Sequence, residues 1–451
     1  MSSAAEQLAA NFSFSTFSKA EELKKRILFT LGALIIYRLG TYIPLPGVDT
    51  EVFSNAFGGL SGGILDMFNL FAGGAVERMA IFALNIMPYI SASIIVQLLT
   101  AVYPHFEQLK KEGEAGRKQL NQYTRYGTVV LAAFQGYGIA VGMEATNFNG
   151  VSAVADPGWF FRLTAVVTLV GSVMFLLWLG EQITARGIGN GVSLIILAGI
   201  VAELPRSAGS VLELGRTGQL SFPIILAIAV GALAIIAFVV FIERSQRRLL
   251  IQYPRRQQAR GGMAGGEKSH MPLKLNTAGV IPPIFASSLL LLPVTVAGFA
   301  GQQAGGPEWL QTLLALTGRG QPLYLLLYGA LIVFFCFVYT SIIFNPTDVA
   351  ENLKKYGGYI QGYRPGARTA EYIDYVLTRL TVIGAAYLAF VCLLPEFIFR
   401  YFSGVPVALG GTSLLIAVTV TMDTVSQIQG HLLAHQYEGL IKKSRLRGAR
   451  R

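Results

Sequence analysis

The chain has 451 residues, of which 53% are hydrophobic and only 14% are charged. Soluble domains carry about 25% charged residues, so this composition excludes an ordinary water-soluble protein and favours a bilayer as solvent. The net charge of +11 must gather outside the apolar runs, where it orients helices or contacts an anionic partner.

Residues 1–23 are polar, and we expect no cleavable signal peptide in them. Ser18 followed by Glu21 resembles a capping box, which marks the start of a helix. The segment is therefore predicted to be a short amphipathic helix on the cytoplasmic membrane surface, ahead of the first span.

Apolar runs then recur along the rest of the chain, and ten of them approach the roughly 20 residues that cross a bilayer. The predicted spans cover residues 24–43, 76–100, 123–143, 159–180, 190–204, 221–242, 275–297, 321–344, 377–395 and 405–427. The fifth is the shortest and opens on the glycine-rich residues 187–191 (GIGNG). Residues 58–75 are also apolar, but they are too short and too interrupted by glycine to span.

The distribution of Lys and Arg predicts that both termini are cytoplasmic. With that orientation, all but seven of the 36 basic residues lie in cytoplasmic segments. The exceptions are Arg38, Arg78, Arg162, Arg206, Arg216, Arg319 and Arg400. An even number of spans agrees with this arrangement.

The predicted fold is an all-α membrane protein of ten transmembrane helices in two pseudo-symmetric halves of five, an inverted repeat. The halves cover residues 24–210 and 211–428, and a basic cytoplasmic tail, 429–451, follows. Pro88 in the second span and Pro282 in the seventh occupy corresponding places. Paired interruptions of this kind indicate a functional centre at mid-membrane, although proline is also common in ordinary membrane helix packing.

The predicted spans contain almost no ionisable side chains. Ion-coupled transporters and charged selectivity filters need such groups inside the bilayer. Paired carboxylates, metal motifs and nucleophile elbows are also missing from the sequence, so we expect no enzyme activity, catalytic residue, metal or cofactor. An apolar pore or a structural protein without a pore remains, with a small-solute transporter as the competing hypothesis.

Two long basic loops interrupt the second half, at residues 243–274 and 345–376. Glycine pairs in the first loop favour a hairpin-like excursion. Loops of this length are often functional, and their charge suits a phosphate backbone or an acidic protein face. Charge alone does not choose between these partners, and control of helix orientation is the simpler alternative.

Several motifs, in order along residues 20–445, resemble the SecY/Sec61-alpha family. They are 44–47 (PLPG), 87–95 (MPYISASII), 122–128 (QYTRYGT), 180–184 (GEQIT), 186–191 (RGIGNG), 284–288 (IFASS), 364–366 (RPG) and 410–416 (GGTSLLI). The resemblance implies an hourglass-shaped, protein-conducting channel between the two halves, with an apolar ring at its constriction. The ring positions are Ile86, Ile90, Val192, Ile196, Ile284 and Ile416. Val192 departs from the isoleucine often found there, but it keeps the branched shape.

The resemblance also implies a plug, a short helix in the outer vestibule, at residues 59–74. Its central residues are Ile64, Leu65, Asp66, Met67, Phe68, Asn69 and Leu70. Glycines at both ends would let it swing aside. The second and seventh spans would form a lateral gate that releases transmembrane segments sideways into lipid, with Ser91, Gln97 and Asn276 as its polar positions.

The implied partners are SecE, SecG, the motor ATPase SecA, the ribosome, translocating precursor proteins and membrane lipids, with SecD/SecF and YidC as further associates. SecA or the ribosome would supply the energy and dock on Arg255, Arg256, Arg260 and Arg364. The expected location is the bacterial plasma (inner) membrane, with a plastid relative as the alternative.

Overall fold

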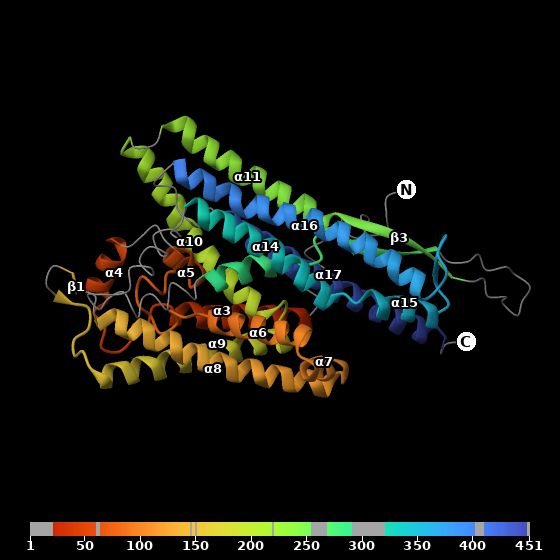
Figure 1. Cartoon of the computed structure of the whole chain (residues 1–451), viewed down its shortest axis with the longest axis horizontal. Coiled ribbons are helices and arrows are strands. Elements are labelled where there is room, and N and C mark those ends of the chain that lie inside the picture. Colours follow the sequence, from red (N-terminus) through yellow and green to blue (C-terminus); the bar gives the residue numbers. More distant parts are fainter. Residues whose placement is uncertain are drawn as a thin grey trace, which may run out of the picture.

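The computed structural model describes residues 21–59, 64–144, 147–148, 151–218, 221–253, 268–290, 321–401 and 410–448. The predicted N-terminal amphipathic helix lies mostly outside these residues, as do Arg255, Arg256 and Arg260. The described helices form two blocks in chain order, with α10 running between them (Figure 1).

The first block holds the helices of the first half. Its long helices are α3 (Glu21–Gly40), α6 (Met87–Val102), α8 (Glu114–Glu144), α9 (Trp159–Arg186) and α10 (Gly191–Arg216). Its short helices are α4 (Thr50–Gly59), α5 (Ile64–Phe71) and α7 (Pro104–Lys111). A small hairpin of β1 (Asn147–Phe148) and β2 (Val151–Ser152) connects α8 to α9.

The second block holds the helices of the second half. Its helices are α11 (Phe222–Arg244), the Ile281–Leu290 helix, α14 (Pro322–Ile343), α15 (Pro346–Lys355), α16 (Ala367–Tyr401) and α17 (Gly411–Gly448). Among the described residues, six helices are long and apolar enough to cross a membrane: α8, α9, α10, α11, the run from α14 into α15, and α16. The predicted count of ten spans is therefore supported in part.

The second predicted span is not helical from residue 76, because residues 72–86 form turns and α6 begins only at Met87. Pro88 lies in the first turn of α6, where the missing N–H of proline would have no partner in any case. Pro282 likewise lies in the first turn of the Ile281–Leu290 helix. The paired prolines therefore start two helices at corresponding places and do not kink them.

The fifth predicted span is too short, because α10 continues through Pro205 to Arg216. The glycine-rich residues 187–191 lead into α10, which begins at Gly191. The Asn190 side chain accepts hydrogen bonds from the backbone N–H groups of Val192 (3.1 Å) and Ser193 (3.3 Å), which makes it the N-cap.

The hairpin expected in the first basic loop is confirmed: β3 (Gln246–Gln252) pairs antiparallel with β4 (Lys268–Lys274). The two basic loops are not separate, however, because β5 (Tyr359–Ile360) from the second loop pairs with β3. The resulting three-stranded sheet has the order β4-β3-β5.

Two hydrophobic clusters hold these parts together. The main core draws buried residues from the helices of both blocks. A satellite core fixes the sheet to the N-terminal half of α16, and its buried members are Leu249, Leu273, Ile360, Ile373, Val376 and Leu380.

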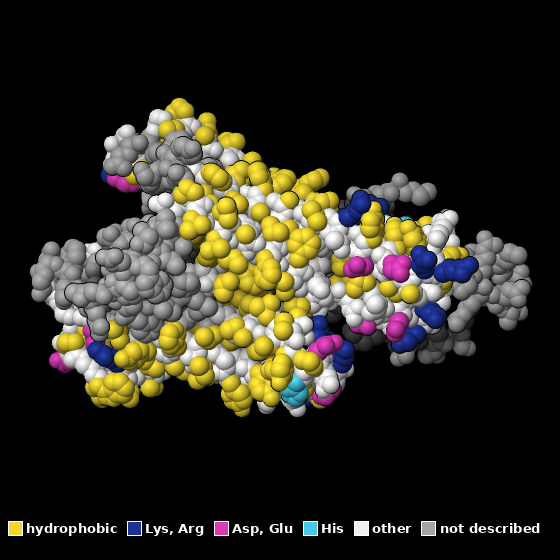
Figure 2. Space-filling view, in the orientation of Figure 1, with side chains coloured by type: hydrophobic (Ala, Val, Ile, Leu, Met, Phe, Trp, Pro, Cys, Tyr) yellow, Lys and Arg dark blue, Asp and Glu magenta, His cyan; other side chains and the backbone are white. Residues whose placement is uncertain are grey.

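The surface in Figure 2 is apolar across the middle of the molecule, and charged side chains gather toward the end where α15 and β3 lie. A continuous apolar band of this kind on a helical protein is suited to contact with lipid.

Candidate functional site

The six predicted ring residues come from different segments of the chain, and each belongs to the main core or packs against it. Five of them are buried members of the main core: Ile86, Ile90, Ile196, Ile284 and Ile416. Val192 is half-buried and packs against the same core. These residues lie on α10, α17, the Ile281–Leu290 helix, and α6 with its N-cap. The ring positions therefore carry β-branched apolar side chains within a core that both blocks share, and their arrangement as a ring stays a prediction.

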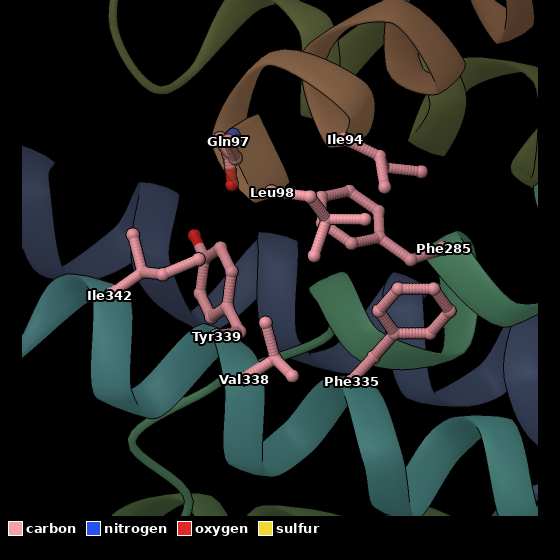
Figure 3. Close-up of a pocket in the computed structure, with 8 residues that line it drawn as sticks. All are labelled: Ile94, Gln97, Leu98, Phe285, Phe335, Val338, Tyr339 and Ile342. Atoms are coloured by element: carbon pink, nitrogen blue, oxygen red, sulfur yellow. The ribbon is translucent and has the colours of Figure 1, made fainter. Parts of the chain in front are cut away.

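A narrow groove lies where α6, the Ile281–Leu290 helix and α14 meet (Figure 3). Its lining residues are Ile94, Gln97, Leu98, Phe285, Phe335, Val338, Tyr339 and Ile342. Phe285 makes edge-to-face contacts with Phe335 (5.8 Å between ring centroids) and Tyr339 (6.0 Å), which join two walls of the groove. The second and seventh predicted spans thus meet at a largely apolar surface.

The three predicted polar gate residues lie in different surroundings, and among these described residues no hydrogen bond joins one to another. Ser91 is buried on α6. Gln97 donates to the Ser93 hydroxyl one turn earlier (3.0 Å). Asn276 lies before the Ile281–Leu290 helix and donates to Glu243 (2.7 Å). Their shared role at a gate stays a prediction.

The predicted plug segment contains α5. Phe68 and Leu70 are buried and Asn69 is half-buried, whereas the side chains of Ile64, Leu65, Asp66 and Met67 lie outside the described part. The end of α5 contacts α10 at Gly199, where a Cβ atom would overlap the Phe71 carbonyl oxygen. The absence of a side chain at Gly199 therefore permits this close packing.

The C-terminal end of α5 is held by three side-chain hydrogen bonds. The Asn85 amide donates to the Phe71 carbonyl (2.5 Å). The guanidinium groups of Arg38 (2.6 Å) and Arg78 (2.9 Å) both donate to the Gly73 carbonyl. Gly73 has a φ of +64°, which bends the chain, but these bonds fix the bend in place.

Of the seven basic residues that were predicted to lie outside the cytoplasmic segments, three arginines form ion pairs with carboxylates. Arg206 binds both oxygens of Glu77, at 2.7 and 2.8 Å. Arg162 pairs with Glu144 (2.6 Å), and Arg216 pairs with Glu213 (2.7 Å). Only the last pair could be anticipated from spacing, because its members lie three residues apart on one helix.

Glu243 is the functional candidate that the sequence did not reveal. It follows the apolar run of α11 directly and reads as a loop charge, yet only 9% of its surface is exposed. Its one signal in the sequence is its position at the junction of an apolar run and a basic loop.

Arg364, the one predicted docking residue that the structure describes, is exposed in the turn between β5 and α16. Its backbone carbonyl accepts a hydrogen bond from the Thr369 hydroxyl (2.8 Å), which orders this turn. The arginine side chain is thus presented to solvent beside the three-stranded sheet.

Long apolar helices in two blocks, an apolar core to which both blocks contribute and a charged end define a multi-spanning helical membrane protein. The sequence profile of the SecY family matches residues 80–425. The protein translocase subunit SecY of Escherichia coli (strain K12) is 53% identical over 428 residues, covering 95% of this chain and 96% of the relative. The SecY subunit of Pseudomonas aeruginosa is 54% identical, covering 95% of both. The chain belongs to the SecY family.

Solved structures agree on the fold. A protein-conducting channel superposes with a TM-score of 0.64 at 17% identity, covering 90% of this chain and 92% of that one. Sec61 from the canine ribosome-channel complex superposes with a TM-score of 0.60 at 17% identity and the same coverage. At such low identity the likeness concerns the fold alone.

Proposed function

We propose that this chain is the channel-forming subunit of a bacterial Sec translocase in the plasma membrane. It moves unfolded secretory proteins across the membrane and releases transmembrane segments sideways into lipid. The observation that carries the proposal is the main apolar core, to which both blocks contribute. It occurs in a chain that is more than half identical to translocase subunits along nearly its full length.

The ring residues suit a seal that must also yield. Apolar side chains resist ions by excluding water from a narrow opening, and they make no fixed bonds to a passing chain. In this proposal the ring closes the resting channel and α5 blocks it as a plug. Ten spans in two inverted halves, with both termini in the cytoplasm, complete the channel.

The groove between α6, the Ile281–Leu290 helix and α14 supports the lateral gate. The groove is closed by apolar side-chain contacts. An apolar segment of a precursor can replace these contacts and then move into lipid at little cost, because the segment and the lipid are equally apolar. Ser91, Gln97 and Asn276 are its proposed polar positions.

The three-stranded sheet and the turn of Arg364 form the proposed docking surface for SecA or the ribosome, together with Arg255, Arg256 and Arg260. SecE and SecG are the proposed membrane partners. The ribosome complex of a structural relative, Sec61, is in keeping with docking at these loops.

The first test is reconstitution into liposomes with SecE, SecG and SecA, in which ATP-dependent protection of a secretory precursor from protease is measured. Protection that requires this chain supports the channel. A folded complex that protects no precursor contradicts it and favours the small-solute transporter, which flux assays would then examine.

Arg364→Glu should slow SecA-driven export, because it reverses the charge on the proposed docking surface. The rate of precursor protection at several SecA concentrations measures the effect. Arg117→Glu is the matched control, since Arg117 is an exposed arginine on α8 of the first block and lies outside that turn and the sheet. An unchanged rate in Arg364→Glu would remove this turn from the docking surface.

A further inference from the structure

The base of the β3–β4 hairpin connects directly to two membrane helices. α11 ends one residue before β3, and β4 leads through a short turn into the Ile281–Leu290 helix. The two segments at the base of the hairpin stay paired one residue beyond the strands, because the Leu275 N–H donates to the Ser245 carbonyl (3.0 Å). The next connection is the hydrogen bond from Asn276 to Glu243 (2.7 Å).

The Asn276 side chain also closes the turn that precedes the helix. Its amide group donates to the Gly279 carbonyl (3.1 Å), and its oxygen accepts from the Gly279 N–H (3.1 Å). The helix begins two residues later at Ile281. One buried side chain therefore binds both the end of α11 and the turn that starts the proposed gate helix.

α16 supports both the turn and the sheet. A Cβ atom at Gly384 of α16 would lie 3.0 Å from the Leu275 carbonyl oxygen and 3.5 Å from the Cα atom of Asn276, so glycine allows the turn to pack directly on this helix. The satellite core fixes the sheet to the same helix. The sheet, the turn and α16 thus form one packed unit.

The burial of the Glu243 carboxylate is energetically unfavourable unless hydrogen-bond or charged partners compensate it. Burial of a carboxylate costs free energy, and the C-terminal end of a helix already carries partial negative charge. An ionisable residue buried at the end of a membrane helix is a functional candidate for this reason. The Asn276 amide compensates it with a hydrogen bond, and the Tyr387 hydroxyl of α16 and the Lys274 ammonium group also interact with it.

We propose that Glu243 is the positioning residue that holds the Ile281–Leu290 helix to the three-stranded sheet. This rests on the proposed function, in which that helix is one side of the lateral gate. The hydrogen bond to Asn276 makes the start of the gate helix follow any displacement of the sheet. Loss of the bond leaves docking intact but uncouples it from the gate.

The experiment measures the distance across the gate by spin-label spectroscopy. The labels are placed at Ile95→Cys on α6 and Leu289→Cys on the gate helix, which are 45% and 40% exposed and so accept a label without repacking. Cys336 and Cys392 are replaced by Ala in this background. The channel is reconstituted in liposomes with SecE and SecG, and distances are recorded with and without SecA, a nucleotide analogue and precursor.

In the parent channel we expect the distance to shift when SecA is added. Glu243→Ala should lose that shift while SecA binding is unchanged. Glu243→Gln should keep it, because its amide oxygen still accepts a hydrogen bond from Asn276. Thr277→Val is the control in the same turn, since the Thr277 hydroxyl makes no hydrogen bond in the described structure.

A normal shift in Glu243→Ala would overturn the proposal, and so would loss of the shift in Glu243→Gln. If Glu243→Ala does not fold, Gly384→Ala gives an independent test, because its added methyl displaces the turn while Glu243 remains. Precursor protection in the parent vesicles is measured in parallel. If the parent vesicles protect no precursor, the channel function itself is contradicted. If they protect the precursor and Glu243→Ala shows a normal shift, only the coupling is contradicted.

Discussion

At the scale of single residues, Gly199 sets how closely α5 approaches α10. A Cβ atom there would overlap the Phe71 carbonyl oxygen and lie 3.2 Å from the Gly73 nitrogen. Gly199→Val should therefore push the end of α5 away, lower the stability by about 1–3 kcal/mol through overpacking, and raise the resting ion leak. Thermal unfolding in detergent and conductance of planar bilayers measure the two effects.

Gly209→Val is the matched control on the same helix, because Gly209 is exposed and a Cβ atom there would meet no described atom within 4 Å. Equal leak in the two variants would mean that the position of α5 does not affect closure of the channel.

At the scale of elements, the three-stranded sheet depends on the satellite core. Leu249 on β3 is buried against α16, whereas Leu250 points to the other face and is only half-buried. Leu249→Ala should lower the local stability of the sheet by about 2–5 kcal/mol and leave the membrane helices unaffected. Hydrogen exchange of the β3–β4 amides measures this, and Leu250→Ala, the control, should have a smaller effect. Faster exchange throughout α8 and α9 would contradict an independent satellite core.

The sequence predicts that the helices and the hairpin exist better than it predicts the residues at which they begin and end. Apolar length and periodicity identify the helical segments, and glycine pairs identify the hairpin, because these signals are local. The start of α6 at Met87 and the continuation of α10 through Pro205 depend on packing against other helices, which a single sequence does not display. The pairing of β5 with β3 joins residues about 100 positions apart, and no local pattern indicates it.

At the scale of the whole molecule, the main core takes its buried side chains from both blocks. Ile416 of α17 is 1% exposed in the core that also contains Ile90 of α6. Ile416→Asn places a polar amide there, so water should enter more easily and resting ion conductance should rise. Val425→Asn is the control, because Val425 lies on the same helix and is 45% exposed. Unchanged conductance in Ile416→Asn would argue against an apolar seal at this place.

The sequence predicts the candidate site only in part, because the roles of its residues depend on contacts between distant segments. An isoleucine in a membrane helix is usually a packing residue, so Ile86 or Ile196 gains a role only through the resemblance to a family. Glu243 was missed because its burial comes from contact with the turn of Asn276, 33 residues later in the chain. Such contacts exist only once distant segments have met.

The satellite core also has a consequence for the order of biosynthesis. The β3–β4 hairpin is complete at residue 274, but its supporting residues on α16 begin at Ile373. At about 5–20 residues per second, a separation of about 100 residues delays that support by roughly 5–20 s. Leu249 and Leu273 stay uncovered during this interval. The three-stranded sheet therefore matures late, although two of its strands are synthesised in the middle of the chain.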